Sequence, residues 1–393
     1  MNLRGFAWRE GYMWGKVIGY AGAGAESPIV PPDFIDGDLP PPAVDGYDQF
    51  GWQPDGDRFK HRPAMLVEHK KVSVLRSSLG RNRWHLVLAE GICDRDSYHD
   101  GAWIGPHIGE TVAFELPEGR HATINLMDEA PIEARVKSPC VLIGHFWSEN
   151  YAHTLLETCS RFWYLDKHPD IAALPVVWDL NKPWQKELAE WFVPGKVKAL
   201  PHNHVYFDEL YVPSFYSNVG MSQAQIQWLR KRLGAPEKPG KRRIYISRAD
   251  ALERRVTNEN EIVDRLKGFG FETVMLTGMS VAEQRALFQE AGCVVMPHGA
   301  GCANMIFAGT GTKIIEFVPE SYQHHMYWHI AKWCGHWYGR MVCPDGENKD
   351  MRVDVNVLVQ ALTAGHHDKG DGARCYPREG FCTSTGKIES FEA

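Results

Sequence analysis

The feature that most constrains the fold is a regular alternation of apolar runs and amphipathic segments in the second half of the chain. RRIYISR at 242–248, ETVML at 272–276 and CVVMPHG at 293–299 have the length and composition of buried strands, and KIIEFVP at 313–319 is a fourth. Segments of helical periodicity lie between them. Strands that alternate with helices in this way form a parallel sheet with helices on both faces. We therefore predict an α/β fold with a Rossmann-like domain in this half.

Capping signals support two of the helices. Ser280 and Glu283 have the spacing of a capping box before SVAEQRALFQEAG. Asn258 and Glu261 form a variant of the same box before NENEIVDRLKGFG. We expect both helices to begin at these residues.

The first half has the same alternation in a less regular form, behind a Pro- and Gly-rich start. Short runs of β-like composition predict a small antiparallel or mixed sheet, and later apolar runs alternate with helical segments. The predicted strands lie at 64–75, 83–92, 111–117, 139–146 and 175–180. The predicted helical segments run from about Asn150 to His168, from about Trp184 to Phe192, and over 222–234.

The polar, basic segment APEKPGKRR at 235–243 is the best linker candidate. It predicts two Rossmann-like domains that face each other across a cleft, with ligands at the carboxyl ends of the strands. The predicted parts are an irregular N-terminal segment at 1–60, an N-terminal acceptor domain at 61–238, a C-terminal donor domain at 239–345, a helix at 346–364 and a polar tail at 365–393.

Composition excludes some classes of function. The net charge of -6 and the pI of about 6.3 argue against a dedicated nucleic-acid binder. Nine cysteines with no zinc-site spacing predict free thiols, with a Cys375–Cys382 bridge as the lesser alternative. No signal-peptide pattern or long apolar run is present. We expect a cytoplasmic protein with room for peripheral contact at the inner face of a membrane, and the sequence leaves its oligomeric state open.

A glycine turn follows the third strand. Gly299, Ala300 and Gly301 separate the strand from a short helix, with His298 before them and Asn304 after. Glycines let a phosphate approach the backbone closely and allow positive φ, and a helix N-terminus favours anions. The alternative is a tight turn that binds nothing. For His298 the choice is open between donor contact and a hydrogen bond to the turn's own backbone.

A cluster of polar side chains follows the first strand of this half. It comprises Ser247, Arg248, Arg254, Arg255 and Asn258. Arginine makes bidentate contacts with phosphate oxygens, so a cluster at a strand end beside the glycine turn points to an anion site. Solvated surface charge is the alternative.

Two glutamates, Glu157 and Glu316, complete the set of candidate site residues. Glu157 follows His153 by four residues on a predicted helix, so its carboxylate can orient the imidazole as a general base. A surface pair or a buried, hydrogen-bonded histidine is the alternative.

Glu316 is expected at a strand end, where it would accept ribose hydroxyls or else pair with a neighbouring arginine.

Five motifs, YISR, RRVTNENE, a helix with Glu283-Gln284, CVVMPHGAGCANMIF and KIIEFVP, occupy 244–319 in this order. Their order and spacing resemble glycosyltransferase family 61, which includes plant xylan xylosyl- and arabinosyltransferases and animal N-acetylglucosaminyltransferases. Asn150-Tyr-Ala-His153 with an acidic residue at 157 is similar to that family's N-terminal motif. The resemblance implies a GT-B fold, a nucleotide-sugar donor in the C-terminal half, and inverting transfer without a metal or cofactor.

By position, the resemblance assigns Arg248 and Arg255 to the donor diphosphate, with the glycine turn beside them and Asn304 at the family's Asn position. Charge that develops on the leaving diphosphate must be met by arginines and backbone N–H groups. The acceptor hydroxyl needs a base on the opposite face, for which His153 is the first candidate and Glu157 the second.

The sequence therefore predicts a hexosyl- or pentosyltransferase that uses a UDP-sugar. The chain lacks the secretory signals of animal members, so we expect a bacterial member that acts on a cell-surface polysaccharide or a lipid-linked oligosaccharide. Two alternatives differ in class. One is a catalytically inactive nucleotide-sugar or glycan-binding protein on the same fold. The other is a Rossmann oxidoreductase, which the missing third glycine of the fingerprint disfavours.

Overall fold

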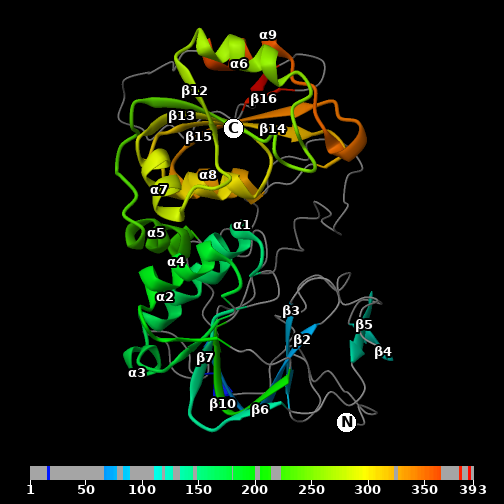
Figure 1. The fold of residues 1–393 in the computed structure, drawn as a ribbon, viewed down its shortest axis with the longest axis vertical. Helices are drawn as coiled ribbons and strands as arrows, with labels where there is room; N and C mark the ends of the chain where they lie inside the picture. The colour runs from blue at the N-terminus through cyan, green and yellow to red at the C-terminus, as the bar shows by residue number, and fades with distance from the viewer. Residues whose placement is uncertain are drawn as a thin grey trace. The chain divides into compact units, whose positions relative to one another are not determined.

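The structure is a computed structural model (Figure 1), in which the described residues form two compact units. Unit 1 comprises residues 1–37 and 50–225, and unit 2 comprises residues 38–49 and 226–393. The predicted domain boundaries stay predictions. The described residues are 133–144, 148–178, 180–199, 204–213, 223–322 and 326–363, with strands at 16–17, 66–77, 83–88, 110–116, 120–126, 380–382 and 388–390.

Unit 2 is built on a seven-stranded sheet in the order β12-β11-β13-β14-β15-β16-β17. All neighbouring strands are parallel except β16 and β17, which confirms the predicted parallel sheet. The strands are β11 Arg242–Ser247, β12 Phe271–Met275, β13 Ala291–Pro297, β14 Lys313–Pro319, β15 Trp337–Cys343, β16 Gly380–Cys382 and β17 Ile388–Ser390. The last two were not expected, because they lie in the tail predicted to be irregular.

Helices cover both faces of this sheet, with α6 and α9 on one face and α7 and α8 on the other (Figure 1). Under α6 and α9, Ile262, Leu266 and Leu358 pack on Tyr245 and Phe317 of the sheet, all of them buried. The helical elements are α5 Gln223–Arg232, which crosses the unit boundary, α6 Glu259–Lys267, α7 Val281–Gln289, the 3₁₀ helix η3 Ala300–Phe307, α8 Met326–Cys334, the 3₁₀ helix η4 Glu347–Lys349 and α9 Val355–Thr363.

One of the two predicted capping boxes is present. At α7, the Glu283 N–H donates to Ser280 Oγ at 3.2 Å, and the Ser280 N–H donates to Glu283 Oε2 at 2.7 Å. The box predicted at Asn258 is wrong. Its amide donates to the Glu261 carboxylate and to the Val353 carbonyl, and its Oδ1 accepts from the Val353 N–H. Asn258 thus ties the start of α6 to a distant segment instead of capping the helix.

Unit 1 contains a mixed sheet in the order β1-β2-β10-β7-β8-β9, with β3 paired to β2 and β6 paired to β10. Strands β10, β7, β8 and β9 are mutually parallel, and β2 is antiparallel to β10 and β3. The pair β4–β5 forms a separate hairpin. The strands are β1 Lys16–Val17, β2 Leu66–Ser77, β3 Arg83–Leu88, β4 Glu110–Leu116, β5 Arg120–Leu126, β6 Ala134–Val136, β7 Cys140–Leu142, β8 Val176–Val177, β9 Val197–Lys198 and β10 His204–Pro213.

The helical segment predicted from about Asn150 to His168 is present, but a π-helical turn interrupts it. The elements are α1 Tyr151–His153, the π-helix η2 Thr154–Thr158, α2 Phe162–Leu165 and α3 Pro169–Ala172, followed by α4 Pro183–Phe192. Most π-turns occur as single insertions in α-helices and often at functional sites. No helix in the described part of the chain is long and apolar enough to cross a bilayer.

Six cysteines of the two units are free and buried, in agreement with the expected free thiols: Cys140, Cys159, Cys293, Cys302, Cys334 and Cys343. Cys375 lies outside the described residues, as does the side chain of Cys382, so the alternative bridge stays untested. Apart from β1, the segment 1–60 predicted to be irregular also lies outside them.

Candidate functional site

The strand order of unit 2 reverses between β11 and β13, because the chain runs from β11 to β12 on one side and to β13 on the other. Ligands of open parallel sheets bind outside the carboxyl ends of the strands at such a switch point. Ser247 ends β11 and Arg248 follows it, while β13 ends at Pro297 and His298 follows. The topology therefore brings the two clusters predicted from the sequence to one place.

Gly299 lies directly under the Arg248 guanidinium. A Cβ at Gly299 would come within 2.1 Å of Arg248 Nη1, so any side chain here would displace the arginine. The positive φ that glycine allows is not used in this turn, because Gly299 has an extended backbone (φ 170°) and Gly301 is not in the left-handed region either. Gly299 provides space for the guanidinium and not conformational freedom.

Arg248 and Arg254 form a partly buried pair of cations. Arg248 Nη2 donates to the Glu253 carbonyl at 3.2 Å, and Arg254 Nη2 lies 2.6 Å from the Glu253 carboxylate. The Nε atom of each arginine is buried without a hydrogen-bond partner. Burial, and then the charge of Arg254, lower the pKa of Arg248, although arginine stays protonated. Glu253 thus contacts both cations at the switch point, Arg248 through its backbone carbonyl and Arg254 through its carboxylate.

Arg255 is held by a carboxylate. Its Nη2 and Nε donate to Asp350 Oδ2 at 2.6 and 2.9 Å, and its backbone N–H donates to Asp350 Oδ1 at 2.8 Å. These hydrogen bonds raise the pKa of Arg255 and lower that of Asp350. In this structure Arg255 joins the segment after β11 to the segment before α9. Its expected contact with the diphosphate stays a prediction, as does that of Asn258.

His298 is bonded to Glu316 in the core. His298 Nδ1 lies 2.5 Å from Glu316 Oε1, and Tyr338 Oη donates to the other carboxylate oxygen. Glu316 is fully buried in the middle of β14, so its expected place at a strand end is wrong. Arg340 lies opposite it on β15, in line with the structural alternative. Contact of His298 or Glu316 with a donor stays a prediction.

Asn304 and Ala300 lie on η3, which is a 3₁₀ helix. Asn304 is fully buried, and its Nδ2 donates to Gln284 Oε1 at 2.8 Å. This bond connects η3 to α7 beneath the glycine turn. Asn304 therefore acts on the shape of the turn in this structure, and its predicted ligand contact is untested.

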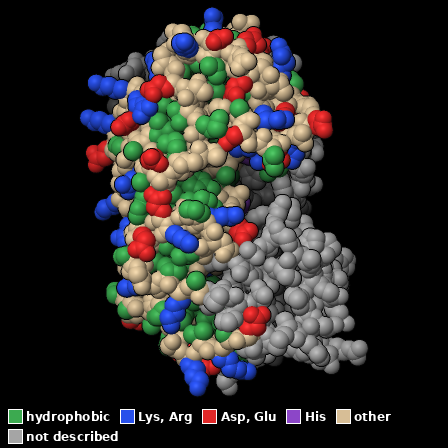
Figure 2. Space-filling view, viewed as in Figure 1, with side chains coloured by type: hydrophobic (Ala, Val, Ile, Leu, Met, Phe, Trp, Pro, Cys, Tyr) green, Lys and Arg blue, Asp and Glu red, His purple; other side chains and the backbone are tan. Residues whose placement is uncertain are grey.

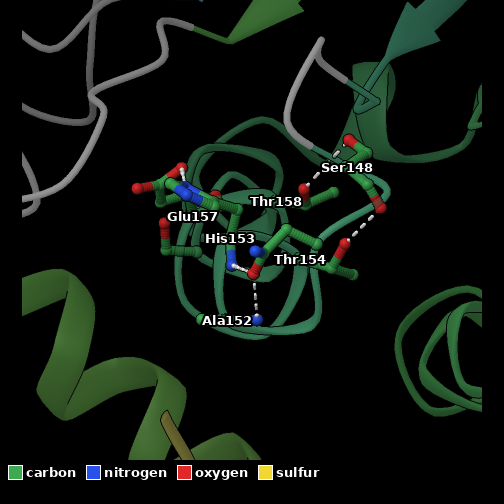
Figure 3. Close-up of polar contacts among 8 residues, drawn as sticks. Ser148, Ala152, His153, Thr154, Glu157 and Thr158 are labelled. Atoms are coloured by element: carbon green, nitrogen blue, oxygen red, sulfur yellow. Dashed lines mark hydrogen bonds and ion pairs between the residues drawn. The ribbon is translucent and has the colours of Figure 1, made fainter. Parts of the chain in front are cut away.

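His153 and Glu157 form the predicted pair in unit 1 (Figure 3). His153 Nδ1 lies 2.7 Å from Glu157 Oε2, with side chains 15% and 1% exposed. A hydrogen bond from Nδ1–H to the carboxylate makes Nε2 the nitrogen that would accept a proton. Asn150 Oδ1 caps α1 by accepting from the N–H groups of Ala152 and His153 at 2.9 and 3.4 Å. The cap holds the backbone at His153, and the Glu157 carboxylate holds its imidazole.

Buried polar contacts hold the helix under this pair. Thr154 Oγ1 donates to the Ser148 carbonyl at 2.6 Å, and the hydroxyls of Ser148 and Thr158 lie 3.3 Å apart (Figure 3). The buried guanidinium of Arg161 donates to the carbonyls of Ile143 and Pro213. Sequence analysis missed these residues, and Arg161 could not be found from local spacing because the Pro213 carbonyl lies 52 residues further along the chain.

Two further residues missed by sequence analysis lie beside the arginines of unit 2. The Tyr322 ring lies 5.6 Å from the His298 ring, and Lys349 Nζ lies 4.1 Å from the centre of the Tyr322 ring. Neither belongs to a local motif. Only the tertiary fold brings them to the switch point.

Charges of both signs are interspersed over the described part of the visible surface (Figure 2), in keeping with a net charge of -6. Within the described residues, no group of three His, Cys, Asp or Glu side chains could hold a metal ion.

Residues 151–315 match the family model described as Glycosyltransferase 61. A rice (Oryza sativa subsp. japonica) protein named Beta-1,2-xylosyltransferase RCN11 is 29% identical over 90 residues, which cover 21% of this chain and 17% of that protein. An Arabidopsis thaliana Beta-1,2-xylosyltransferase is 28% identical over 125 residues, which cover 28% of this chain and 22% of that protein. The match thus spans about a fifth of the length of these relatives. The matched region contains the His153 pair, the arginines and the glycine turn, and over these residues the chain is similar to glycosyltransferase family 61.

Proposed function

We propose that the protein is an inverting, metal-independent glycosyltransferase that moves a sugar from a nucleoside-diphosphate sugar to a hydroxyl of a glycan or glycolipid. One observation carries the proposal: Arg248 and Arg254 are half-buried at the switch point of unit 2, and their buried Nε atoms have no hydrogen-bond partner. Buried polar groups are normally paired, so these atoms favour a ligand rich in acceptor oxygens.

The donor diphosphate fits this place chemically. Its oxygens would accept from Arg248 and Arg254, whose charges exceed that of the single Glu253 carboxylate. As the bond from the sugar C1 to the diphosphate breaks, negative charge grows on the leaving oxygens. Preorganised guanidinium groups in a site of low dielectric stabilise that charge without a metal ion.

The acceptor hydroxyl requires a base, and His153 supplies one. With Nδ1 bonded to Glu157, the imidazole would accept the hydroxyl proton at Nε2, and Glu157 would stabilise the resulting imidazolium. Glu157 itself is almost fully buried, so we assign it a positioning role. A single displacement at C1 by the activated hydroxyl inverts the configuration at that carbon.

The relatives suggest the first donor to try. Both are named as xylosyltransferases, so UDP-xylose is the starting point among UDP-sugars. We propose a glycan or lipid-linked oligosaccharide as the acceptor, in cell-surface polysaccharide synthesis at the cytoplasmic side of a membrane. The bacterial origin expected from the sequence stays a prediction.

Thermal-shift measurements with UDP, GDP, CMP and NAD test the donor class. A ligand that binds only the native state raises the melting temperature, and we expect UDP to do so. Stabilisation by NAD with none by UDP or GDP would overturn the proposal. UDP binding without sugar transfer to any glycan acceptor would favour the catalytically inactive alternative.

A further inference from the structure

Tyr322 is the centre of a cluster of charged groups beside the arginines. Lys349 Nζ lies 4.1 Å and Arg254 Cζ lies 5.3 Å from the centre of its ring. The His298 ring centre lies 5.6 Å away. Cations favour the face of an aromatic ring, so Tyr322 gives both side chains a defined position. Lys349 and Arg254 are thereby held at the same aromatic ring.

The backbone that carries these cations is strained. In the described part of the chain, the non-glycine residues with positive φ are Arg254 (58°), Asn348 (57°) and Lys349 (58°). Arginine and lysine gain nothing locally from the left-handed conformation, which costs on the order of 1 kcal/mol per residue. Such strain persists where the surrounding structure imposes it, and it concentrates at ligand-binding sites.

Specific bonds impose the strain. The Arg254 N–H donates to the Asn348 carbonyl at 3.0 Å, and the Met351 N–H donates to the Arg255 carbonyl at 2.7 Å. The ion pair of Arg255 with Asp350, at 2.6 Å, closes the same connection through side chains. These contacts fasten the segment after β11 to η4, so that both strained cations are held at Tyr322.

The cluster carries an excess of positive charge. Arg248, Arg254 and Lys349 are cations. Among the described residues, the three form a single salt bridge, between Arg254 and Glu253. The charge of Arg254 disfavours the protonated state of Arg248 and lowers its pKa, which adds to the effect of burial. A ligand with two phosphate groups would relieve this repulsion and supply acceptors for the buried Nε atoms.

We propose that Lys349 is a donor-binding residue that, with Arg254 at Tyr322, holds the diphosphate of the nucleotide sugar. The assignment rests on the proposed function. It adds to the proposed donor site a cation from the segment before α9, which lies outside the matched residues 151–315. Arg248 and Arg254 bind from the segment after β11, and Lys349 binds from η4. The contact between the two segments then becomes part of the donor site.

Calorimetric titration of UDP and uridine into the full chain tests this role. Lys349→Met keeps the length of the side chain and removes its charge, and we expect UDP to bind roughly tenfold more weakly and uridine to bind unchanged. Lys349→Arg should stay within about threefold of the wild type for UDP, because the charge is kept. Lys267→Met, at the exposed end of α6, removes a lysine charge of unit 2 elsewhere and should leave UDP binding unchanged.

Lys349→Gly separates binding from folding. Glycine accepts the positive φ at residue 349, so the melting temperature should be equal or higher while UDP binding weakens as in Lys349→Met. Wild-type affinity for UDP in Lys349→Met would overturn the assignment, and so would an equal loss for UDP and uridine. If the wild type itself binds no nucleoside diphosphate, the proposed function fails first and the Lys349 assignment fails with it.

Discussion

Unit 1 and unit 2 each contain a histidine bonded through Nδ1 to a glutamate, and the two pairs differ in how they are made. His153 and Glu157 are four residues apart on one helical segment, with 2.7 Å between nitrogen and oxygen. His298 follows β13 and Glu316 lies on the neighbouring strand β14, 18 residues further along the chain, with 2.5 Å between His298 Nδ1 and Glu316 Oε1. The first histidine side chain is 15% exposed and the second 7%.

The difference shows that a histidine–glutamate pair can have different roles in different surroundings. Glu316 also accepts a hydrogen bond from Tyr338, and the His298 ring packs against Tyr322 and Tyr327. That pair is enclosed and fixes the shape of the switch point. The His153 pair lies on a helix, where the imidazole can reach solvent and exchange a proton. We therefore propose His153 as the base and a positioning role for the His298 pair.

The largest expected effect is the loss of sugar-transfer rate in the variant His153→Ala. Loss of the base should lower the transfer rate about 10³-fold, because general-base catalysis contributes 10² to 10⁴. The dissociation constant for UDP should not change, since the arginines remain. Initial rates of sugar transfer at saturating donor measure the effect. His168→Ala, a histidine before α3, is the control that should keep the rate. A normal rate in His153→Ala would show that the base is assigned wrongly.

Glu316→Ala should destabilise unit 2 by about 3 kcal/mol, because it leaves buried donors without their acceptor. Urea unfolding followed by tryptophan fluorescence measures the loss. Glu157→Ala is the matched change in unit 1 and should cost less stability, while it lowers the transfer rate. The comparison fails if Glu157→Ala destabilises the protein more than Glu316→Ala does.

His336 is a buried histidine of unit 2 that has no carboxylate partner among the described residues. It should make the stability of unit 2 fall at acidic pH. Its Nε2 donates to the Met305 carbonyl at 2.8 Å, and burial, then the charge of Arg230, lower its pKa to about 3. The unfolded state, with a pKa near 6.5, binds the proton first, so stability falls as pH drops from about 6.5 towards 3.

The expected loss is about 2 kcal/mol at pH 5, at roughly 1.4 kcal/mol per pH unit. Melting temperatures of the wild type and His336→Gln between pH 5 and 7 measure it. The variant should lose part of the pH slope, since glutamine does not titrate. An unchanged slope would show that His336 is not the acid-sensitive group.

The smallest effects concern the helix caps of the two units. Asn150→Ala and Ser280→Ala should each cost about 1 kcal/mol of stability, because each removes a side-chain acceptor for backbone N–H groups. Asn150→Ala should also lower the transfer rate a few-fold, since α1 carries His153, whereas Ser280→Ala should not. Equal transfer rates in the two variants would show that the Asn150 cap does not position His153.

The sequence predicted the fold of unit 2 in much of its detail, because β11 to β14 are apolar runs bounded by helices with clear periodicity. Strand β15 was missed, since Trp337–Cys343 is largely buried, which removes the alternation typical of strands. The π-turn at Thr154–Thr158 was missed as well, because π and α turns share the same residue pattern.

Local spacing predicted part of the site. The bond between His153 and Glu157 follows from four-residue spacing, and the place of Arg248 follows from the end of its strand. The partner of Arg255 could not be predicted, because Asp350 lies 95 residues further along the chain. The same holds for Tyr322 and Lys349, whose position depends on the contact between two distant segments.

A calorimetric titration of UDP into the wild type, His153→Ala and Arg248→Ala tests the central claim most directly. We predict that His153→Ala binds UDP with the wild-type dissociation constant and transfers sugar about 10³-fold more slowly, while Arg248→Ala binds UDP at least tenfold more weakly. Wild-type UDP affinity in Arg248→Ala would contradict its assignment to the donor site, and a loss of UDP binding in His153→Ala would contradict its assignment as a base that does not bind the donor.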